Sequence, residues 1–195
     1  MKKVLIIDTK AGNLFSLKAA IERLGFSTKV LQKPNDETFD AIVIPGQGRF
    51  GTVMTNMVAN DWPKYLISAQ EKEIPMLGIC VGMQIFFDAS DEDPNVQGLG
   101  WFSGKAQALD FPKKPMVGWA ALSSQIESWS DSIVYFVNSY AVKQSEYSLA
   151  ETYYGEKFCA AVKKGSFIGV QFHPEKSSSA GEKLIQQALT GTVGN

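Results

Sequence analysis

The stretch Met76-Leu77-Gly78-Ile79-Cys80-Val81-Gly82 decides the fold, because an apolar run passes here into a helical pattern through a cysteine flanked by glycines. Segment 76–79 is typical of a strand buried on both faces, and 81–87 is predicted to be helical. A nucleophile on so sharp a turn has a strained backbone, and its neighbours two positions away must lack a Cβ atom. The N-terminus of the following helix would favour the thiolate. We therefore interpret Cys80 as a nucleophile, the alternative being a buried structural cysteine.

Strands and helices alternate on the N-terminal side of this stretch. Apolar or short extended runs predict strands at 4–7, 28–31 and 41–44. Helical spacing predicts helices from Leu14 to Leu24, with Gly25 as the stop, and over 51–59 and 62–72, with Asp61 as the cap of the last one. This alternation favours a parallel sheet with helices on both faces.

The C-terminal side has a different pattern, in which strand-like segments are separated by short turns. Strands are predicted at 106–109, 133–137, 148–154, 158–162 and 167–172, with hairpin turns at Gly155-Glu156 and Gly165-Ser166 and a closing helix over 181–189. The polar segment 88–100 is predicted to be a surface loop. The predicted fold class is α/β: an open, mostly parallel sheet with helices on both faces and mixed or antiparallel strands in the C-terminal half, forming one domain over 1–195.

Composition excludes several classes of function. The 195 residues include 19 Lys and Arg against 20 Asp and Glu, so no basic excess is available for nucleic acid. Apolar segments are too short to span a bilayer, and 1–8 is interpreted as a buried strand rather than a secretory segment because its apolar run stops at Asp8. One His and two Cys give no metal-ligand spacing, and two cysteines fit a reducing cytoplasm. We expect no metal and no cofactor.

The single histidine lies in the second motif, Gln171-Phe172-His173-Pro174-Glu175. Residues two apart share a face of an extended chain, so Glu175 could orient the imidazole of His173. A cysteine, a histidine and an orienting acid form a complete acyl-transfer triad. The alternative is a histidine satisfied at a strand end. The other cysteine, Cys159, lies within a predicted strand without flanking glycines and is interpreted as core.

A third motif, Pro45-Gly46-Gln47-Gly48, follows the predicted strand 41–44. Glycines let backbone N–H groups approach a substrate, so Gly46, Gln47 and Gly48 are candidates for an oxyanion site together with the N–H of Val81. Because sites in open α/β sheets collect at the carboxyl ends of strands, we expect Gly46, Cys80 and His173 to lie together.

In this order, the motifs at 45–48, 78–84 and 171–175 resemble those of the class I (triad) glutamine amidotransferases. The resemblance runs from Met1 to Leu189. Within the family, the chain most resembles the glutaminase subunits of imidazole glycerol phosphate synthase. Further residues that carry this likeness are Ile7-Asp8, Gly12-Asn13-Leu14, Gly98-Leu99-Gly100, Gly118-Trp119, Tyr135-Phe136-Val137, Ser139-Tyr140 and Lys176-Ser177.

The resemblance implies the hydrolysis of glutamine to glutamate and ammonia. It implies that Cys80 attacks the side-chain amide, that His173 protonates the leaving ammonia and then activates water, and that Glu175 holds His173. Candidate glutamine-binding groups, by the same resemblance, are Gln84, Glu92 and the backbone of Ser139 and Tyr140.

The resemblance also implies a partner, a separate (β/α)₈-barrel cyclase subunit that uses the ammonia to make imidazole glycerol phosphate and an aminoimidazole carboxamide ribonucleotide. We expect this subunit to dock near Asn13, Trp119 and Tyr135. The chain departs from the family pattern at positions outside the triad, several of them near the implied docking side: Thr9, Lys10, Gln47, Met116, Val117, Ala120 and Asn138.

Three alternatives stay open at this point. The chain could supply ammonia to a sugar-modifying synthase as a paralogous subunit. It could be a stand-alone cysteine amidohydrolase, which would turn over without a partner. It could be a catalytically silent scaffold, although the presence of Cys80, His173 and Glu175 argues against that.

Overall fold

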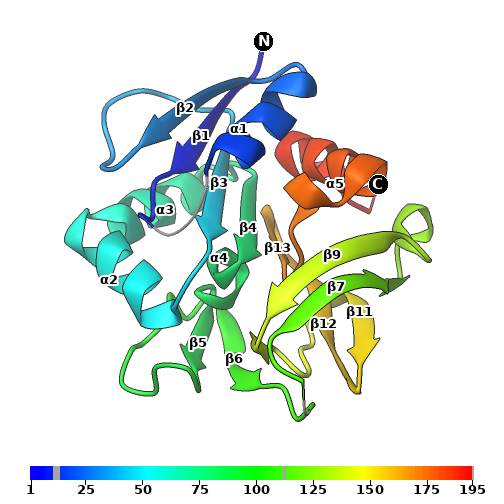
Figure 1. Cartoon of the computed structure of the whole chain (residues 1–195). Helices are drawn as coiled ribbons and strands as arrows, with labels where there is room; N and C mark the ends of the chain where they lie inside the picture. Colours follow the sequence, from blue (N-terminus) through cyan, green and yellow to red (C-terminus); the bar gives the residue numbers. More distant parts are fainter. Residues whose placement is uncertain (11–13, 112, 195) are drawn as a thin grey trace.

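The main sheet of the computed structural model has eight strands in the order β2-β1-β3-β4-β13-β12-β11-β8 (Figure 1). The structure describes residues 1–10, 14–111 and 113–194. The first five strands in this order, β2, β1, β3, β4 and β13, run parallel to one another. Strands β12, β11 and β8 each pair antiparallel with the strand before them. The predicted mixed sheet is therefore confirmed. The strand bounds are β1 Lys3–Ile7, β2 Ser27–Leu31, β3 Ala41–Gly46, β4 Met76–Cys80, β8 Ser123–Ser124, β11 Ser148–Tyr154, β12 Glu156–Lys164 and β13 Phe167–Val170.

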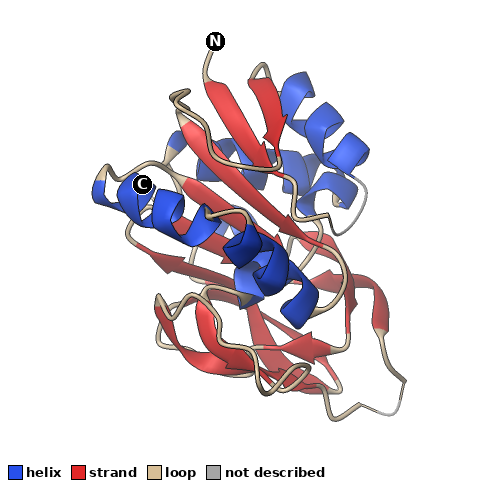
Figure 2. Cartoon of the chain, turned by 90° about the vertical axis from the view of Figure 1, so that its left-hand side faces the viewer, coloured by secondary structure: helices blue, strands red, loops and turns tan. Residues whose placement is uncertain are grey.

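Helices cover both faces of this sheet (Figure 2). Helix α5 contacts α1 on one face and packs on β3 and β4, while α2, α3 and α4 form the layer on the other face. The predicted α/β layering is confirmed. The helix bounds are α1 Leu14–Arg23, α2 Phe50–Ala59, α3 Trp62–Glu71, α4 Val81–Gln84 and α5 Ser178–Thr190.

Two small sheets stand beside the C-terminal half of the main sheet (Figure 1). One has the order β10-β6-β5, with β10 Tyr140–Ala141, β6 Phe102–Ala108 and β5 Phe87–Ser90. The other is an antiparallel ribbon of β7 Met116–Ala121 and β9 Ile133–Asn138. Two 3₁₀ turns complete the chain, η1 Glu127–Trp129 and η2 Pro174–Lys176.

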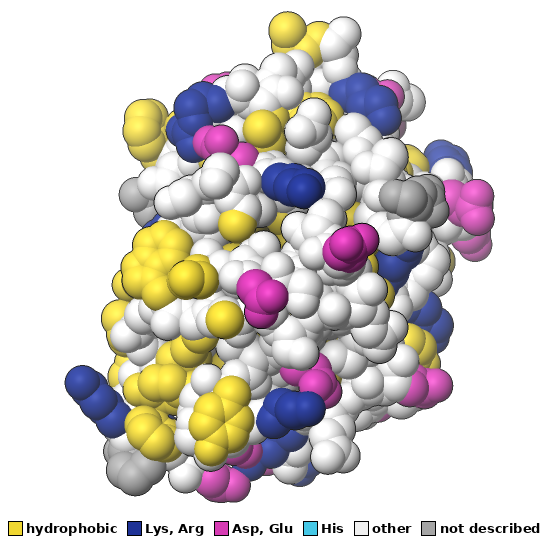
Figure 3. Space-filling model, turned by 90° about the vertical axis from the view of Figure 1, so that its right-hand side faces the viewer, with side chains coloured by type: hydrophobic (Ala, Val, Ile, Leu, Met, Phe, Trp, Pro, Cys, Tyr) yellow, Lys and Arg dark blue, Asp and Glu magenta, His cyan; other side chains and the backbone are white. Residues whose placement is uncertain are grey.

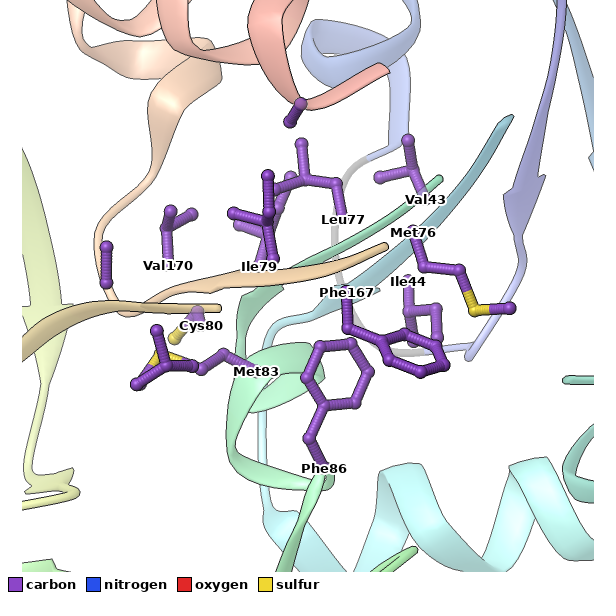
Figure 4. Packing of buried hydrophobic residues seen from close by; sticks show 14 of the residues in the cluster. Val43, Ile44, Met76, Leu77, Ile79, Cys80, Met83, Phe86, Phe167 and Val170 are labelled. Atoms are coloured by element: carbon purple, nitrogen blue, oxygen red, sulfur yellow. The ribbon is translucent and has the colours of Figure 1, made fainter. Parts of the chain in front are cut away.

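The central strands carry the core. All residues of β3, β4 and β13 are buried, as expected of strands covered by helices on both faces. Leu77 and Ile79 of β4 point toward α5, while Phe86 and Phe167 lie on the opposite side with α4 (Figure 4). Tight packing on both faces holds the carboxyl ends of these strands in fixed positions.

The structure differs from the sequence-based predictions at the start of α3 and at the end of α4. The helix predicted over 81–87 ends at Gln84, and Phe87 begins β5, so that β5 also takes the first residues of the predicted loop 88–100. Phe87 pairs with Phe102 of β6, with ring centroids 5.3 Å apart, and this packing overrides the helical pattern. Asp61 stands at the N-cap of α3, as predicted, but its side chain makes no capping hydrogen bond there. It has φ 59°, and its N–H donates to the carbonyl of Val58 at the end of α2.

Candidate active site

Cys80 stands at the end of β4 on a strained turn, with φ 55° and ψ −114°. The three glycines around it leave no room for a side chain. A Cβ atom on Gly78 would lie 2.5 Å from the carbonyl oxygen of Gly82, and one on Gly82 would lie 1.9 Å from that of Ile44. A Cβ atom on Gly46 would lie 2.3 Å from the nitrogen of Gly82. The sequence Gly-x-Cys-x-Gly, together with Gly46, thus allows the end of β3 to lie directly against the turn.

The helix after Cys80 is shorter than the sequence predicted. Helix α4 spans Val81–Gln84, one turn, before the chain leaves for β5. A single turn sums few peptide dipoles, so the expected dipole effect on the sulfur is small. The surroundings of the sulfur come instead from side chains and carbonyls: Cys80 Sγ lies 3.8 Å from the carbonyl oxygen of Val137 and 3.6 Å from Gln171 Nε2.

His173 and Glu175 form the second part of the site. Their atoms Nδ1 and Oε1 are 2.9 Å apart, and both side chains are almost fully buried. The expected extended geometry is wrong, because β13 ends at Val170 and Pro174 opens the turn η2. The 3₁₀ turn, rather than a shared strand face, brings the carboxylate back to the imidazole.

Strand β9 fixes the backbone of this turn. The N–H of His173 donates to the carbonyl of Tyr135 at 2.8 Å. The N–H of Tyr135 donates to Ser177 Oγ at 3.0 Å, and the Ser177 hydroxyl donates to the carbonyl of His173 at 2.7 Å. Two hydrogen bonds therefore connect Tyr135 of β9 to the two ends of the histidine turn, and a third joins these two ends to each other.

Burial alone would lower the pKa of His173, since the charged form loses water. The hydrogen bonds and negative charges of Cys80 and Glu175 outweigh this and raise the pKa of His173 to about 9. Burial raises the pKa of the Cys159 thiol, by contrast, and that residue has no exposed surface. Cys159 lies within β12, where the sequence predicted core.

A cavity of about 280 Å³ opens over these residues. It gathers most of the predicted site residues, from the ends of β3, β4, β9 and β13 and from the loop after β5. Gly46 and Glu175 do not line the cavity but contact residues that do: Gly46 pairs with Cys80 across β3 and β4, and Glu175 bonds to His173. The lining residues are Gln47, Gly48, Cys80, Val81, Gln84, Glu92, Pro115, Val137, Asn138, Ser139, Tyr140, His173 and Lys176.

The candidate glutamine-binding residues are held by defined contacts. Gln84 Nε2 donates to the carbonyl of Tyr140 at 3.0 Å and to Gln171 Oε1 at 2.9 Å. Glu92 Oε2 accepts from the N–H of Phe50, at the start of α2. The carbonyl of Ser139 accepts from the N–H of Leu109 at 3.0 Å. Hydrogen bonds to neighbouring residues thus hold each of these candidate groups in place.

The segment that follows β3 leads into α2, and hydrogen bonds to Asp93 hold its C-terminal end. Gly48 has φ +124°, a conformation that favours glycine. Arg49 then binds Asp93 at 2.6 Å, and Asp93 Oδ2 accepts from the N–H of Gly51 at 2.8 Å. Two acidic side chains of one loop, Glu92 and Asp93, therefore hold the N-terminus of α2.

Two of the three predicted docking residues, Trp119 and Tyr135, are not among the residues that line the cavity. Trp119 is 54% exposed, and its ring packs edge-on against that of Tyr135 with centroids 5.6 Å apart. Val117 and Ile133 of the same ribbon are each 58% exposed. Figure 3 shows hydrophobic side chains gathered on this side of the molecule, at the left of the view. Asn13 lies outside the described residues.

Sequence reasoning assigns no role to several residues that the structure brings to the site. Gln171 and Lys176 belong to the motifs without a predicted task, and both contact the triad region: Gln171 touches Cys80, and Lys176 lines the cavity. Asn138 stands out in the sequence only as a departure from the family pattern. Within the described residues no group of acidic, Cys and His side chains is arranged to hold a metal ion, and no helix is long and apolar enough to cross a bilayer.

A family model described as glutamine amidotransferase class-I matches residues 5–190. The chain belongs to the class I glutamine amidotransferases. It is 39% identical over 190 residues to the imidazole glycerol phosphate synthase subunit HisH of Thermus thermophilus, with 95% of this chain and 96% of the relative covered. HisH 1 of Vibrio vulnificus is 39% identical over 204 residues (96% and 98% covered), and HisH of Thermotoga maritima is 34% identical over 194 residues (96% of each).

Solved structures agree in fold. A crystal structure of a glutamine amidotransferase superposes with a TM-score of 0.78 at 19% identity, covering 96% of this chain and 98% of that chain. The structure of PurLQS from Thermotoga maritima matches with a TM-score of 0.78 at 17% identity, covering 98% and 99%. The predicted family, α/β fold and glutamine amidotransferase activity of the imidazole glycerol phosphate synthase type are confirmed.

Proposed function

We propose that this amidotransferase hydrolyses glutamine with Cys80 as nucleophile, His173 as acid and base, and Glu175 as the group that orients the imidazole. The observation that carries this assignment is the pair His173 Nδ1 and Glu175 Oε1 at 2.9 Å, beside a cysteine held on a strained turn in the same cavity. The bond at Nδ1 leaves Nε2 of the same ring for the reacting groups.

The reaction proceeds in two halves. The Cys80 thiolate attacks the side-chain amide carbon of glutamine, and the carbon–nitrogen bond breaks as His173 gives its proton to the leaving ammonia. A raised pKa suits this step, because it keeps the imidazolium protonated at neutral pH. Water then attacks the thioester while His173 takes its proton, the carbon–sulfur bond breaks, and glutamate leaves with the thiolate restored.

Charge that develops on the carbonyl oxygen needs N–H donors at the positions it will occupy. The N–H of Val81 and the segment Gly46, Gln47 and Gly48 supply the candidates, since the segment pairs with Cys80 through Gly46 and lines the cavity through the other two. The remaining polar groups of the cavity, Gln84, Glu92, and the backbone of Ser139 and Tyr140, bind the amino-acid end of glutamine in this proposal.

The ribbon β7–β9 is the proposed docking face for a (β/α)₈-barrel cyclase subunit, which would receive the ammonia and close an imidazole ring. Its support is the cluster of exposed apolar side chains, Val117, Trp119 and Ile133, beside the cavity wall that β9 forms. With its catalytic cavity and this docking face, the chain is one amidotransferase domain of a heteromeric synthase in this proposal. Both cysteines are free, which fits a reducing cytoplasm.

The experiment compares two cysteine variants. Cys80→Ala should abolish glutamine hydrolysis, and the matched variant Cys159→Ala should keep most of it, because Cys159 is remote from the cavity. Rates are measured with the chain alone and with its partner copurified from the native cell. Equal losses in two folded variants would overturn the assignment of the nucleophile. Full activity of the isolated chain, unchanged by any copurified protein, would favour a stand-alone amidohydrolase.

A further inference from the structure

Gln171 lies just after β13, two residues before His173, and its side chain has no contact with solvent. Its backbone N–H donates to the carbonyl of Ala160 at 2.9 Å, which fixes the start of the side chain. The side-chain amide is bonded at both ends: Nε2 lies 3.6 Å from Cys80 Sγ, and Oε1 accepts from Gln84 Nε2 at 2.9 Å. A buried amide that contacts two residues of the site can position both of them, in addition to packing in the core.

A main-chain carbonyl determines which way this amide points. The carbonyl of Tyr140 can only accept hydrogen bonds, so Gln84 must present its NH₂ group to it. The same NH₂ group faces Gln171, which must therefore answer with its oxygen. The NH₂ group of Gln171 is left to face Cys80, so the chain of hydrogen bonds ends with a donor aimed at the sulfur.

The Gln171 donor is important because the other polar neighbour of the sulfur, the carbonyl of Val137, can only accept a hydrogen bond. The thiol of Cys80 can donate to the carbonyl of Val137 at 3.8 Å, whereas the thiolate has no proton to give. Gln171 Nε2 can serve both forms, and its hydrogen bond is stronger to the charged one. Because Gln171 is fully buried, this fixed donor also sets the direction of the sulfur.

We propose that Gln171 is a positioning residue of the amidotransferase reaction: its NH₂ group holds the Cys80 sulfur, and its carbonyl oxygen holds Gln84 against the cavity. The inference rests on the proposed function for the role of Cys80. It assigns to one buried side chain the link between the nucleophile and a glutamine-binding residue.

Two substitutions separate the two ends of this amide. Gln171→Glu keeps an oxygen for Gln84 but replaces the donor that faces Cys80 with an acceptor. Gln171→Met keeps the length of the side chain and removes both bonds. The matched control is Gln187→Met on α5, where the lost bond is that of Trp129 Nε1 to Gln187 Oε1 at 2.6 Å, away from the cavity.

The readouts are kcat and KM for glutamine in the complex with the partner, and the rate of alkylation of Cys80 by iodoacetamide across pH. Gln171→Glu should lower kcat and the alkylation rate at neutral pH at least about tenfold, displace the alkylation profile to higher pH, and change KM less than about threefold. Gln171→Met should lower kcat and also raise KM. Gln187→Met should leave these quantities unchanged.

The proposal is overturned if folded Gln171→Glu and Gln171→Met proteins, judged by circular dichroism and thermal melting, keep wild-type kcat and alkylation rates. If Gln171→Glu does not fold, Gln171→Met alone decides, because its loss of rate must appear together with a raised KM. Alkylation needs neither glutamine nor partner. A wild-type chain without glutaminase activity even in the complex with its partner would therefore refute the proposed function, while the alkylation series would still test Gln171.

Discussion

Glu175→Gln should move the titration of His173, and the chain offers an unusually clean way to see it. His173 is the only histidine among the 195 residues, so its ring gives one titrating signal. Burial lowers the pKa of that ring, but the hydrogen bonds and charges of Cys80 and Glu175 outweigh burial and raise the pKa to about 9. Changing the carboxylate to an amide removes one of the two sources that raise the pKa.

The magnitude follows from the structure. A carboxylate in direct contact shifts a partner's pKa by about one to three units, so the midpoint of Glu175→Gln should fall by at least roughly one unit. The raised pKa also stabilises the fold. Between the ordinary 6.5 and about 9, at about 1.36 kcal/mol per unit, the protonated form gains about 3 kcal/mol. That stability is complete below about pH 6.5 and is lost as the pH rises through about 9.

The assay is a proton and carbon NMR titration of the imidazole, combined with urea unfolding at pH 6, 7.5 and 9. The wild type should titrate near 9 and lose stability over that range, whereas Glu175→Gln should titrate lower and lose stability at lower pH. The control is Glu151→Gln, which breaks the surface pair with Lys157 at 2.8 Å and should leave the signal unmoved. A wild-type midpoint near 6.5, or equal midpoints in the wild type and Glu175→Gln, would refute the reasoning.

Three further outcomes are expected. Gly82→Ala should lower kcat at least about a hundredfold in a folded protein, because its Cβ atom would meet the Ile44 carbonyl and displace the turn; a rate within threefold of wild type would contradict this. Asp93→Ala should lower the free energy of unfolding in urea by about 1 kcal/mol, since it removes the bond to the N–H of Gly51 at the start of α2; no change would mean that this cap is not stabilising. Trp119→Ala should weaken partner binding at least about tenfold by calorimetry while leaving unfolding unaffected, and equal affinity would exclude the ribbon as the docking face.

The sequence predicted those parts of the fold that depend on short-range pattern. Apolar runs of four residues predicted β1, β3 and β4, and the glycines around Cys80 predicted the turn, because steric exclusion leaves no other residue type there. The likeness to a known family predicted the activity class. The roles of Cys80, His173 and Glu175 stay predictions, supported by their meeting in one cavity.

The sequence failed where distant segments decide local structure. Phe87 leaves the helical pattern because β6, fifteen residues later, offers it a strand partner and an aromatic neighbour. The ribbon of β7 and β9 forms by pairing across the chain, and no strand was predicted over β7. The role inferred for Gln171 was equally hidden, since its meaning depends on the carbonyl of Tyr140, on a different strand.

Strand β9 contributes both to the exposed β7–β9 ribbon and to the lining of the cavity. Its outer side carries Tyr135 beside Trp119, while its inner end, at Val137 and Asn138, forms a wall of the cavity. The backbone of Tyr135 also holds both ends of the histidine turn. The exposed ribbon surface and the cavity are therefore separated by a single strand. A displacement of β9 would therefore reach the histidine turn through the two backbone hydrogen bonds of Tyr135.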